Sequence, residues 1–154
     1  MPRELSPGAM APAFTLPRDG GGSISLADFA GSKLVLYFYP RADTSGCTKE
    51  AIDFTAHAKA FAKAGATVVG CSKDTIAAHD KFKKKHKLGV TLAADLEGKT
   101  CEAYGVWVEK SLYGRKYMGI ERSTVLVGAD GKIQKAWPKV KIDGHADEVL
   151  SAVK

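Results

Sequence analysis

The sequence predicts an α/β fold in which helices cover a mixed β-sheet. Two runs, residues 34–39 and 66–71, are nearly all apolar and have the length of strands buried on both faces. A longer segment with apolar residues at helical spacing follows each run, and a later Asp-Gly turn at 130–131 separates two more strand-like runs. In a chain of 154 residues, this order of elements indicates one domain, spanning residues 1–154.

The N-terminal part is expected to contain an irregular segment and a small hairpin. Residues 1–10 are rich in Pro and Gly and should be irregular. Residues 14–16 and 23–26 read as short strands on either side of the glycine-rich turn 19–22. The run at 34–39 then supplies the central buried strand.

Two helices are expected next, over residues 47–64 and 75–88. Gly65 is placed to end the first helix. The inward side chains of that helix share a helical spacing: Phe54, Ala58, Phe61 and Ala62. In the second helix Ile76 and Phe82 point inward, but the apolar face is thin, so this helix should lie on the surface.

Shorter elements complete the predicted fold. Residues 91–94 form a short strand, and residues 97–104 form a short helix. Residues 110–119 are polar and contain Gly, which predicts a loop or an irregular strand edge. Residues 124–127 and 132–137 are the two strands of the hairpin around the Asp-Gly turn, and residues 145–153 are the final amphipathic helix.

Composition and charge exclude several classes of protein. No run approaches 18 apolar residues, so no membrane span is expected, and the first residues have no apolar signal-peptide core. Three widely spaced cysteines without a Cys-x-x-Cys pair indicate a reducing, cytoplasmic location. The net charge of +6 could serve an anionic partner, but no nucleic-acid motif accompanies it, and a soluble basic protein is favoured. The four histidines have no metal-ligand spacing with the cysteines, so no metal is expected.

Cys47 stands where the chain passes from the strand at 34–39 to the helix at 47–64. The first turn of a helix has free backbone N–H groups and the positive end of the helix dipole. Both favour the thiolate, which is the nucleophilic form of cysteine. A structural cysteine needs no such position, so the sequence predicts a reactive thiol.

The residues around Cys47 resemble a known active-site signature. Pro40-x-x-x-Thr44-x-x-Cys47 is similar to the signature of the peroxiredoxins. Three other blocks resemble the same family: residues 14–16, 38–40 and 119–124. Two more, residues 103–107 and 140–146, resemble its Q branch, which is also called bacterioferritin comigratory protein.

The resemblance implies a fold and an activity. The fold is thioredoxin-like, with a central mixed sheet flanked by helices and an N-terminal β-hairpin extension. The activity is that of a thiol-dependent peroxidase, which reduces hydrogen peroxide and organic hydroperoxides without a cofactor and serves antioxidant defence. Proteins of this branch are often monomers, and the sequence gives no reason to expect an oligomer.

The resemblance also assigns roles, each of which has a plainer alternative. Cys47 would attack the peroxide and become a sulfenic acid, with the backbone N–H groups of Gly46 and Cys47 stabilising charge on the peroxide oxygens. Thr44 would accept the proton of the peroxide, or only cap the helix. Pro40 would shield the site, or only end the strand. Arg122 would lie beside the thiolate, whereas a lone arginine before a strand is usually solvated.

Two further residues are candidates for supporting roles. Glu50, one turn after Cys47, either holds Arg122 in place or is a favourable acid near a helix N-terminus. Tyr39 either forms a wall of the pocket or belongs to the core.

The chain departs from the branch at the resolving cysteine. The two positions that usually carry it correspond here to Ile52 and to the neighbourhood of Lys83. Cys71 and Cys101 remain, and each could resolve the sulfenic acid or simply pack in the core. Packing is the commoner case, so we expect one-cysteine chemistry with an external thiol as reductant: thioredoxin, glutaredoxin or glutathione.

Two other functions compete with a peroxidase. A thioredoxin-like disulfide reductase would need a Cys-x-x-Cys pair, which the sequence lacks. A redox sensor or basic binding module that has kept only the fold would not need the intact set Pro40, Thr44, Cys47 and Arg122. The sequence therefore favours the peroxidase.

Overall fold

The computed structural model describes residues 7–154. Residues 1–6 of the predicted irregular segment lie outside this range, whereas residues 7–9 form turns and a bend, and Met10 bridges to Lys132. Within the described range, no helix combines the length and the apolar character needed to cross a membrane.

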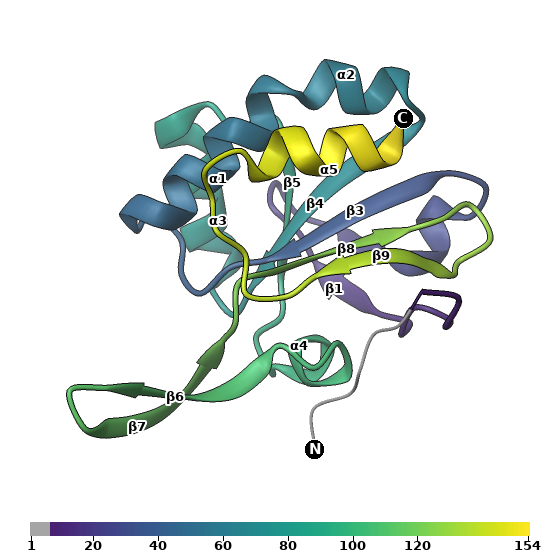
Figure 1. The fold of residues 1–154 in the computed structure, drawn as a ribbon. Helices are drawn as coiled ribbons and strands as arrows, with labels where there is room; N and C mark the ends of the chain where they lie inside the picture. Colours follow the sequence, from purple (N-terminus) through teal and green to yellow (C-terminus); the bar gives the residue numbers. More distant parts are fainter. Residues whose placement is uncertain (1–6) are drawn as a thin grey trace.

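A five-stranded mixed sheet lies at the centre of the molecule, with the order β5-β4-β3-β8-β9 (Figure 1). The central strand β3 runs parallel to β4 and antiparallel to β8, and β4 runs parallel to β5. The strands have the following bounds: β3 (Lys33–Phe38), β4 (Ala66–Ser72), β5 (Thr91–Ala94), β8 (Ser123–Val127) and β9 (Ile133–Trp137).

Helices lie on both faces of this sheet. Their bounds are α1 (Ser45–Ala56), α2 (Ala58–Lys63), α3 (Ile76–His86), α4 (Lys99–Ala103) and α5 (His145–Val153). In Figure 1, α1, α2 and α5 lie on one side of the sheet, and α4 lies on the other. The predicted N-terminal hairpin is present, with the bounds β1 (Thr15–Pro17) and β2 (Ser23–Ser25), followed by the 3-10 helix Leu26–Phe29. This is the thioredoxin-like arrangement expected from the sequence.

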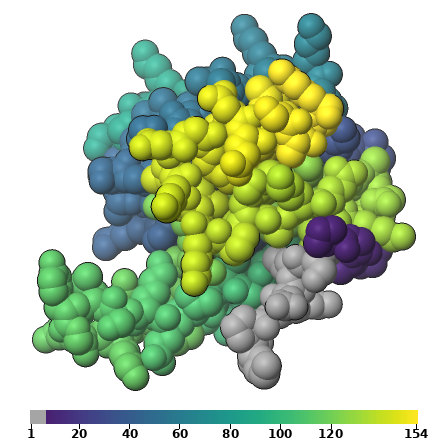
Figure 2. Space-filling model, in the orientation of Figure 1, coloured from purple at the N-terminus to yellow at the C-terminus, as the bar shows by residue number. Residues whose placement is uncertain are grey.

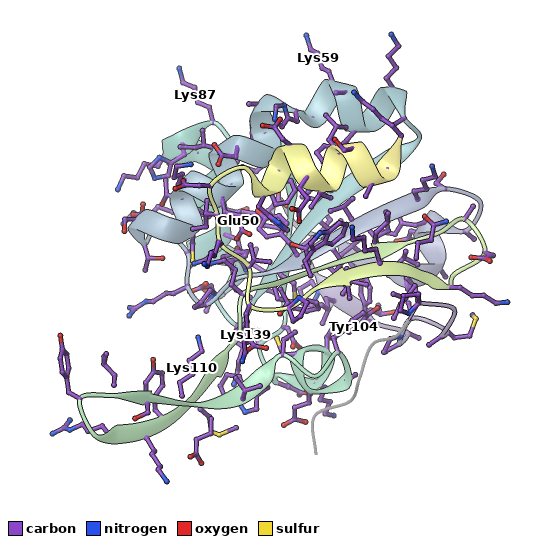
Figure 3. All side chains as sticks on the ribbon, in the orientation of Figure 1. Glu50, Lys59, Lys87, Tyr104, Lys110 and Lys139 are labelled. Atoms are coloured by element: carbon purple, nitrogen blue, oxygen red, sulfur yellow. The ribbon has the colours of Figure 1, made fainter. Side chains whose placement is uncertain are left out.

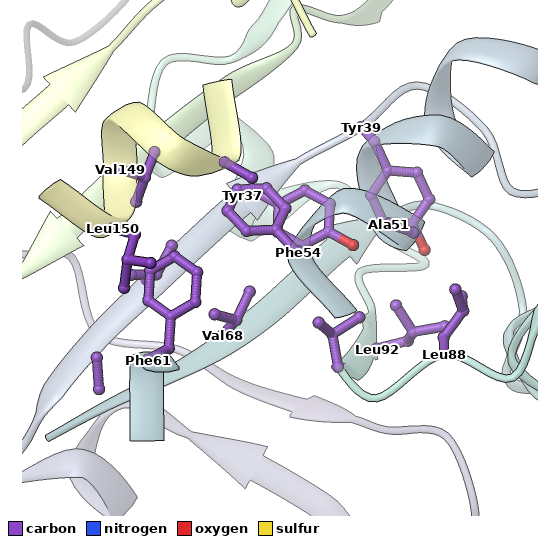
Figure 4. Packing of buried hydrophobic residues seen from close by; sticks show 14 of the residues in the cluster. Tyr37, Tyr39, Ala51, Phe54, Phe61, Val68, Leu88, Leu92, Val149 and Leu150 are labelled. Carbon is purple, nitrogen blue, oxygen red and sulfur yellow. The ribbon is translucent and has the colours of Figure 1, made fainter. Parts of the chain in front are cut away.

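The sheet separates two apolar clusters, because successive side chains of a strand point to opposite faces. Val35 and Tyr37 of β3 belong to the cluster packed against α1, α2 and α5, part of which is drawn in Figure 4. Leu34, Leu36 and Phe38 belong to the cluster on the side of α4 and the N-terminal hairpin. Each large side chain buried in this way stabilises the fold by about 1.5–3 kcal/mol.

The helix predicted over residues 47–64 is in fact two helices. It is interrupted at His57, whose backbone leaves the helical conformation (φ −102°, ψ 7°) and whose Nε2 lies 2.7 Å from Asp147 Oδ1 on α5. The interruption changes the phase of α2 relative to α1. As a result Phe61 is buried as predicted, but Ala62 is exposed, which corrects the predicted inward set.

The loop or irregular edge predicted at residues 110–119 is also corrected. These residues form most of a regular hairpin, β6 (Trp107–Leu112) and β7 (Arg115–Ile120), which turns at Tyr113 and Gly114 with positive φ angles. Residues 111–118 are exposed on both faces, so no alternation of polar and apolar residues marks the strands.

The remaining elements agree with the prediction to within two residues. Thr75, expected as the first residue of its helix, is instead the N-cap of α3, and its hydroxyl accepts a hydrogen bond from the Ala78 N–H. A polar N-cap of this kind typically stabilises a helix by about 1 kcal/mol.

Candidate active site

The thiol predicted to be reactive lies in the first turn of α1, where Cys47 is only 2% exposed. Arg122, which lies between β7 and β8, donates a hydrogen bond from Nη2 to Cys47 Sγ over 3.2 Å. The strand pairing explains this contact: Phe38 at the end of β3 is opposite Ser123 at the start of β8. The loop that follows β3 therefore begins beside Arg122, and a guanidinium at this distance favours the negatively charged form of the sulfur.

Glu50 lies one turn after Cys47 and is 1% exposed. In Figure 3 it lies inside the molecule beside α1, whereas Lys59 and Lys87 extend outward. Arg122 donates from Nη1 to Glu50 Oε1 over 2.6 Å. Burial raises the pKa of the Glu50 carboxyl to about 7, and the opposing effect of Arg122 is smaller. One guanidinium thus bridges a carboxyl group and the thiol.

Thr44 occupies the N-cap position of α1, but its side chain makes no capping hydrogen bond. Instead the Thr44 hydroxyl donates to the Arg41 carbonyl oxygen over 2.9 Å, which leaves the hydroxyl oxygen able to accept. Pro40 is exposed and follows the last buried residue of the strand run, Tyr39. The structure therefore has Thr44 in the cap position without the side-chain bond that the plainer alternative requires.

Gly46 is in close contact with the site. A Cβ atom added to it would lie 3.1 Å from Ile142 Cδ1 and 3.3 Å from Arg122 Nη2, which is tighter than ordinary contact. A larger residue would push against the guanidinium that holds the sulfur. Glycine at this position allows Arg122 and the segment after β9 to close over the first turn of α1.

The comparisons with known proteins agree with this geometry. The family model described as "AhpC/TSA family" matches residues 7–136. The chain is 44% identical over 147 residues to the peroxiredoxin Bcp of Bacillus subtilis, covering 96% of this chain and 94% of the relative. It is 51% identical over 143 residues to a relative from Coxiella burnetii, covering 93% and 95%.

The chain belongs to the peroxiredoxin family, in its Q or Bcp branch. Solved structures agree: peroxiredoxin Q of Xanthomonas campestris has a TM-score of 0.87 at 44% identity, covering 91% of this chain and 89% of that one. A PrxQ variant of Xylella fastidiosa has a TM-score of 0.93 at 35% identity, covering 98% and 96%. Membership of this family makes the protein an oxidoreductase, a thiol-dependent peroxidase.

A buried polar network contacts the active-site loop of this peroxiredoxin, residues 39–44 between β3 and α1, from the interior of the protein. Tyr39 Oη lies 2.8 Å from His79 Nδ1, and His79 Nε2 lies 3.4 Å from Ser72 Oγ. Ser72 Oγ donates to Asp74 Oδ2 over 2.6 Å, and the same carboxylate oxygen accepts from the Ala42 N–H over 2.8 Å. The network thus runs from the residue before Pro40 to the middle of the loop that carries Thr44.

The direction of each hydrogen bond in the network follows from its partners. The one hydroxyl proton of Ser72 goes to the Asp74 carboxylate, so His79 Nε2 must carry the proton of the ring and donate to Ser72. His79 Nδ1 then accepts from the Tyr39 hydroxyl. Burial lowers the pKa of His79 and raises that of Tyr39 well above its usual value, so the ring is neutral and the phenol keeps its proton. Tyr39 is therefore both a core residue and a polar contact of the loop.

A second contact fastens the tip of the loop to α3. Asp43 has a left-handed backbone (φ 61°), and its carboxylate oxygens lie 2.9 Å from Lys85 Nζ and 2.8 Å from His86 Nε2. Neither Asp43 nor His79 was singled out from the sequence. His79 falls on the inward face of α3 with Phe82, three residues away, and that spacing was the available signal.

Cys71 and Cys101 lie on the opposite face of the sheet from Cys47. Cys47 belongs to the apolar cluster of α1, α2 and α5, whereas Cys71 and Cys101 belong to the cluster beside α4. Their sulfur atoms and an Asp95 oxygen lie within 4.8 Å of one another, and the Asp95 carboxylate accepts from the Cys101 N–H over 2.8 Å. The hydrogen bond to Cys71 and burial raise the pKa of the Cys101 thiol far above its usual value. Cys101 is therefore a packed thiol that keeps its proton.

Proposed function

We propose that Cys47 is the peroxidatic residue of a one-cysteine thiol peroxidase. The observation that carries the proposal is the bridge from Arg122 to Cys47 Sγ (3.2 Å) and to Glu50 Oε1 (2.6 Å) at a helix N-terminus. This bridge holds a cation against a buried thiol, which is the condition for a nucleophilic thiolate.

The reaction follows from these groups. The Cys47 thiolate attacks the terminal oxygen of a hydroperoxide, a sulfur–oxygen bond forms, and the oxygen–oxygen bond breaks. The sulfur is oxidised by two electrons, and the proton of the attacked oxygen passes by way of the Thr44 hydroxyl to the other peroxide oxygen, which leaves as water or an alcohol. The sulfenate on Cys47 takes up a proton from solvent and becomes the sulfenic acid. Thr44 can accept the proton of the peroxide, and the N–H groups of Gly46 and Cys47, with Arg122, can stabilise charge on the oxygens. Pro40 forms the outer wall of the site.

The placement of the other cysteines supports an external reductant. Cys71 and Cys101 are separated from Cys47 by the sheet. Ile52 is exposed on α1, and Lys83 is paired with Asp19 at 2.8 Å, so neither familiar resolving position offers a thiol. A thiol from thioredoxin, glutaredoxin or glutathione would attack the sulfenic sulfur and release water, and a second thiol would break the mixed disulfide. The three free cysteines suit a reducing cytoplasm, and we propose a monomer there.

Mass spectrometry after one equivalent of hydrogen peroxide tests this proposal. Cys47→Ser should abolish peroxide consumption, whereas Cys71→Ser and Cys101→Ser should each retain the first turnover and gain one oxygen on Cys47. Undiminished consumption by the Cys47→Ser variant would remove the proposal. A disulfide between Cys47 and either of the other cysteines would replace the one-cysteine mechanism with a two-cysteine one.

A further inference from the structure

The hairpin β6–β7 projects from the body of the protein as a two-stranded arm (Figures 1 and 2). Within residues 7–154 neither strand pairs with another sheet. The register, Lys110 opposite Tyr117 and Leu112 opposite Arg115, divides the side chains between two faces. We call the face with Val108, Lys110, Leu112, Arg115, Tyr117 and Gly119 the Lys110 face.

The arm concentrates exposed apolar area. Of the seven large apolar residues that are exposed in the described part of the chain, four belong to this hairpin. Their exposed fractions are 56% for Leu112, 96% for Tyr113, 47% for Tyr117 and 49% for Met118. Clustered exposure of this kind on a soluble domain usually marks a surface that another molecule covers.

The two faces of the arm differ in charge. On the face opposite to Lys110, Lys116 Nζ lies 3.8 Å from Glu109 Oε1, so positive and negative groups are paired. On the Lys110 face, neither Lys110 nor Arg115 forms an ion pair with any residue from 7 to 154. The Lys110 face thus combines two exposed apolar side chains, Leu112 and Tyr117, with two cations that form no ion pair with the described residues.

The Lys110 face is turned toward the active site. At the base of the arm, Trp107 and Ile120 of the other face pack into the apolar cluster on the far side of the sheet from Cys47. The side chain of Lys110 is close enough to the site for its groups to act on the Lys110 pKa: after burial, the charge of Arg122 lowers it, whereas Glu121 and then Cys47 raise it. The arm therefore extends the rim of the Cys47 site outward.

We propose that the Lys110 face is the docking surface for a protein thiol reductant, one that presents acidic groups beside an apolar contact and its own reactive thiol. This inference rests on the proposed function, since it needs a sulfenic acid on Cys47 to be reduced. A hydroperoxide group is a few ångströms across, whereas six-residue strands extend about 20 Å. An arm of that length beside a nearly buried sulfur suits a macromolecule that must be oriented before its thiol reaches the site.

Matched charge reversals on the two faces test the proposal. Arg115→Glu and the double variant Arg115→Glu/Tyr117→Ser change the Lys110 face, and Lys116→Glu is the control on the other face. Each variant is assayed with thioredoxin, thioredoxin reductase and NADPH, and separately with dithiothreitol. Dithiothreitol is small enough to reach Cys47 without docking on the arm. The expected result is a KM for thioredoxin raised on the order of tenfold in the Lys110-face variants and within about twofold in the control, with dithiothreitol-supported turnover and sulfenic acid formation unchanged.

The outcomes separate the two proposals. Equal effects of Arg115→Glu and Lys116→Glu, or no effect of either, would overturn docking on the Lys110 face. The arm could instead join two copies of the protein. A wild-type dimer in sedimentation that Arg115→Glu converts to a monomer would show this and would also overturn docking of a reductant. If the wild-type protein consumed no peroxide with either reductant, the peroxidase function itself would be overturned, and with it the docking of a reductant on the arm.

Discussion

At the scale of single residues, the site depends on one arginine that makes two contacts. A guanidinium offers donors in a fixed, planar fork, so Arg122 can hold Cys47 Sγ and Glu50 Oε1 at the same time. A lysine would carry the same charge on a single nitrogen and could not donate hydrogen bonds to the sulfur and to the carboxyl oxygen in the same geometry. The identity of this residue therefore matters beyond its charge.

Arg122→Lys tests that distinction. We expect sulfenic acid formation to slow by about 100-fold, in the range seen when a donor to a developing oxyanion is removed. Stopped-flow Trp fluorescence at limiting hydrogen peroxide measures this step without the reductant. A loss of less than about threefold would mean that charge alone accounts for the role of Arg122.

At the scale of elements, α3 and the active-site loop form one connected unit. The Tyr39–His79–Ser72–Asp74 network supports the loop from inside, and the Asp43 carboxylate joins its tip to the end of α3. A buried polar chain of this kind is stable only when every member keeps its partner. The position of Thr44 is thus tied to a helix that contributes no residue to the chemistry.

A double-mutant cycle of Tyr39→Phe and His79→Leu measures this connection. Each single change leaves a buried polar atom without its partner and should cost about 1–3 kcal/mol in the free energy of unfolding. Removing both partners should cost less than the sum, with a coupling of about 1 kcal/mol in urea denaturation. Hydrogen exchange at the Ala42 amide should also speed up in both single variants. Additive effects would mean that the two side chains act independently.

Some elements could be predicted from the sequence and others could not. The strand at 34–39 was predictable because it is apolar throughout, and the Cys47 site because its motif is local. The hairpin β6–β7 was missed because both of its faces are exposed, which removes the alternation that marks a strand. The His79 network was missed because its partners come from β4, α3 and the loop after β3, and only the folded chain brings them together.

At the scale of the whole molecule, buried titratable groups act on stability in opposite directions. Burial lowers the pKa of both His79 and His145. The stability from their neutral forms is present above about pH 6.5, their unfolded value, and is lost as the pH falls through the folded pKa. Glu50 acts in reverse, because burial raises its pKa to about 7.

The Glu50 contribution is fully present below its unfolded pKa of 4.5 and is lost as the pH rises through about 7. Glu50→Gln removes that titration and leaves those of the histidines, so the difference in unfolding free energy between the variant and the wild type isolates Glu50. We expect this difference to shift in favour of the variant by up to about 3 kcal/mol between pH 5 and pH 8, at about 1.4 kcal/mol per pH unit. Urea denaturation of both proteins at the two pH values measures it. A difference that stays constant would mean that Arg122 offsets the burial of Glu50 completely, and that Glu50 and Arg122 form a fully ionised pair throughout this range.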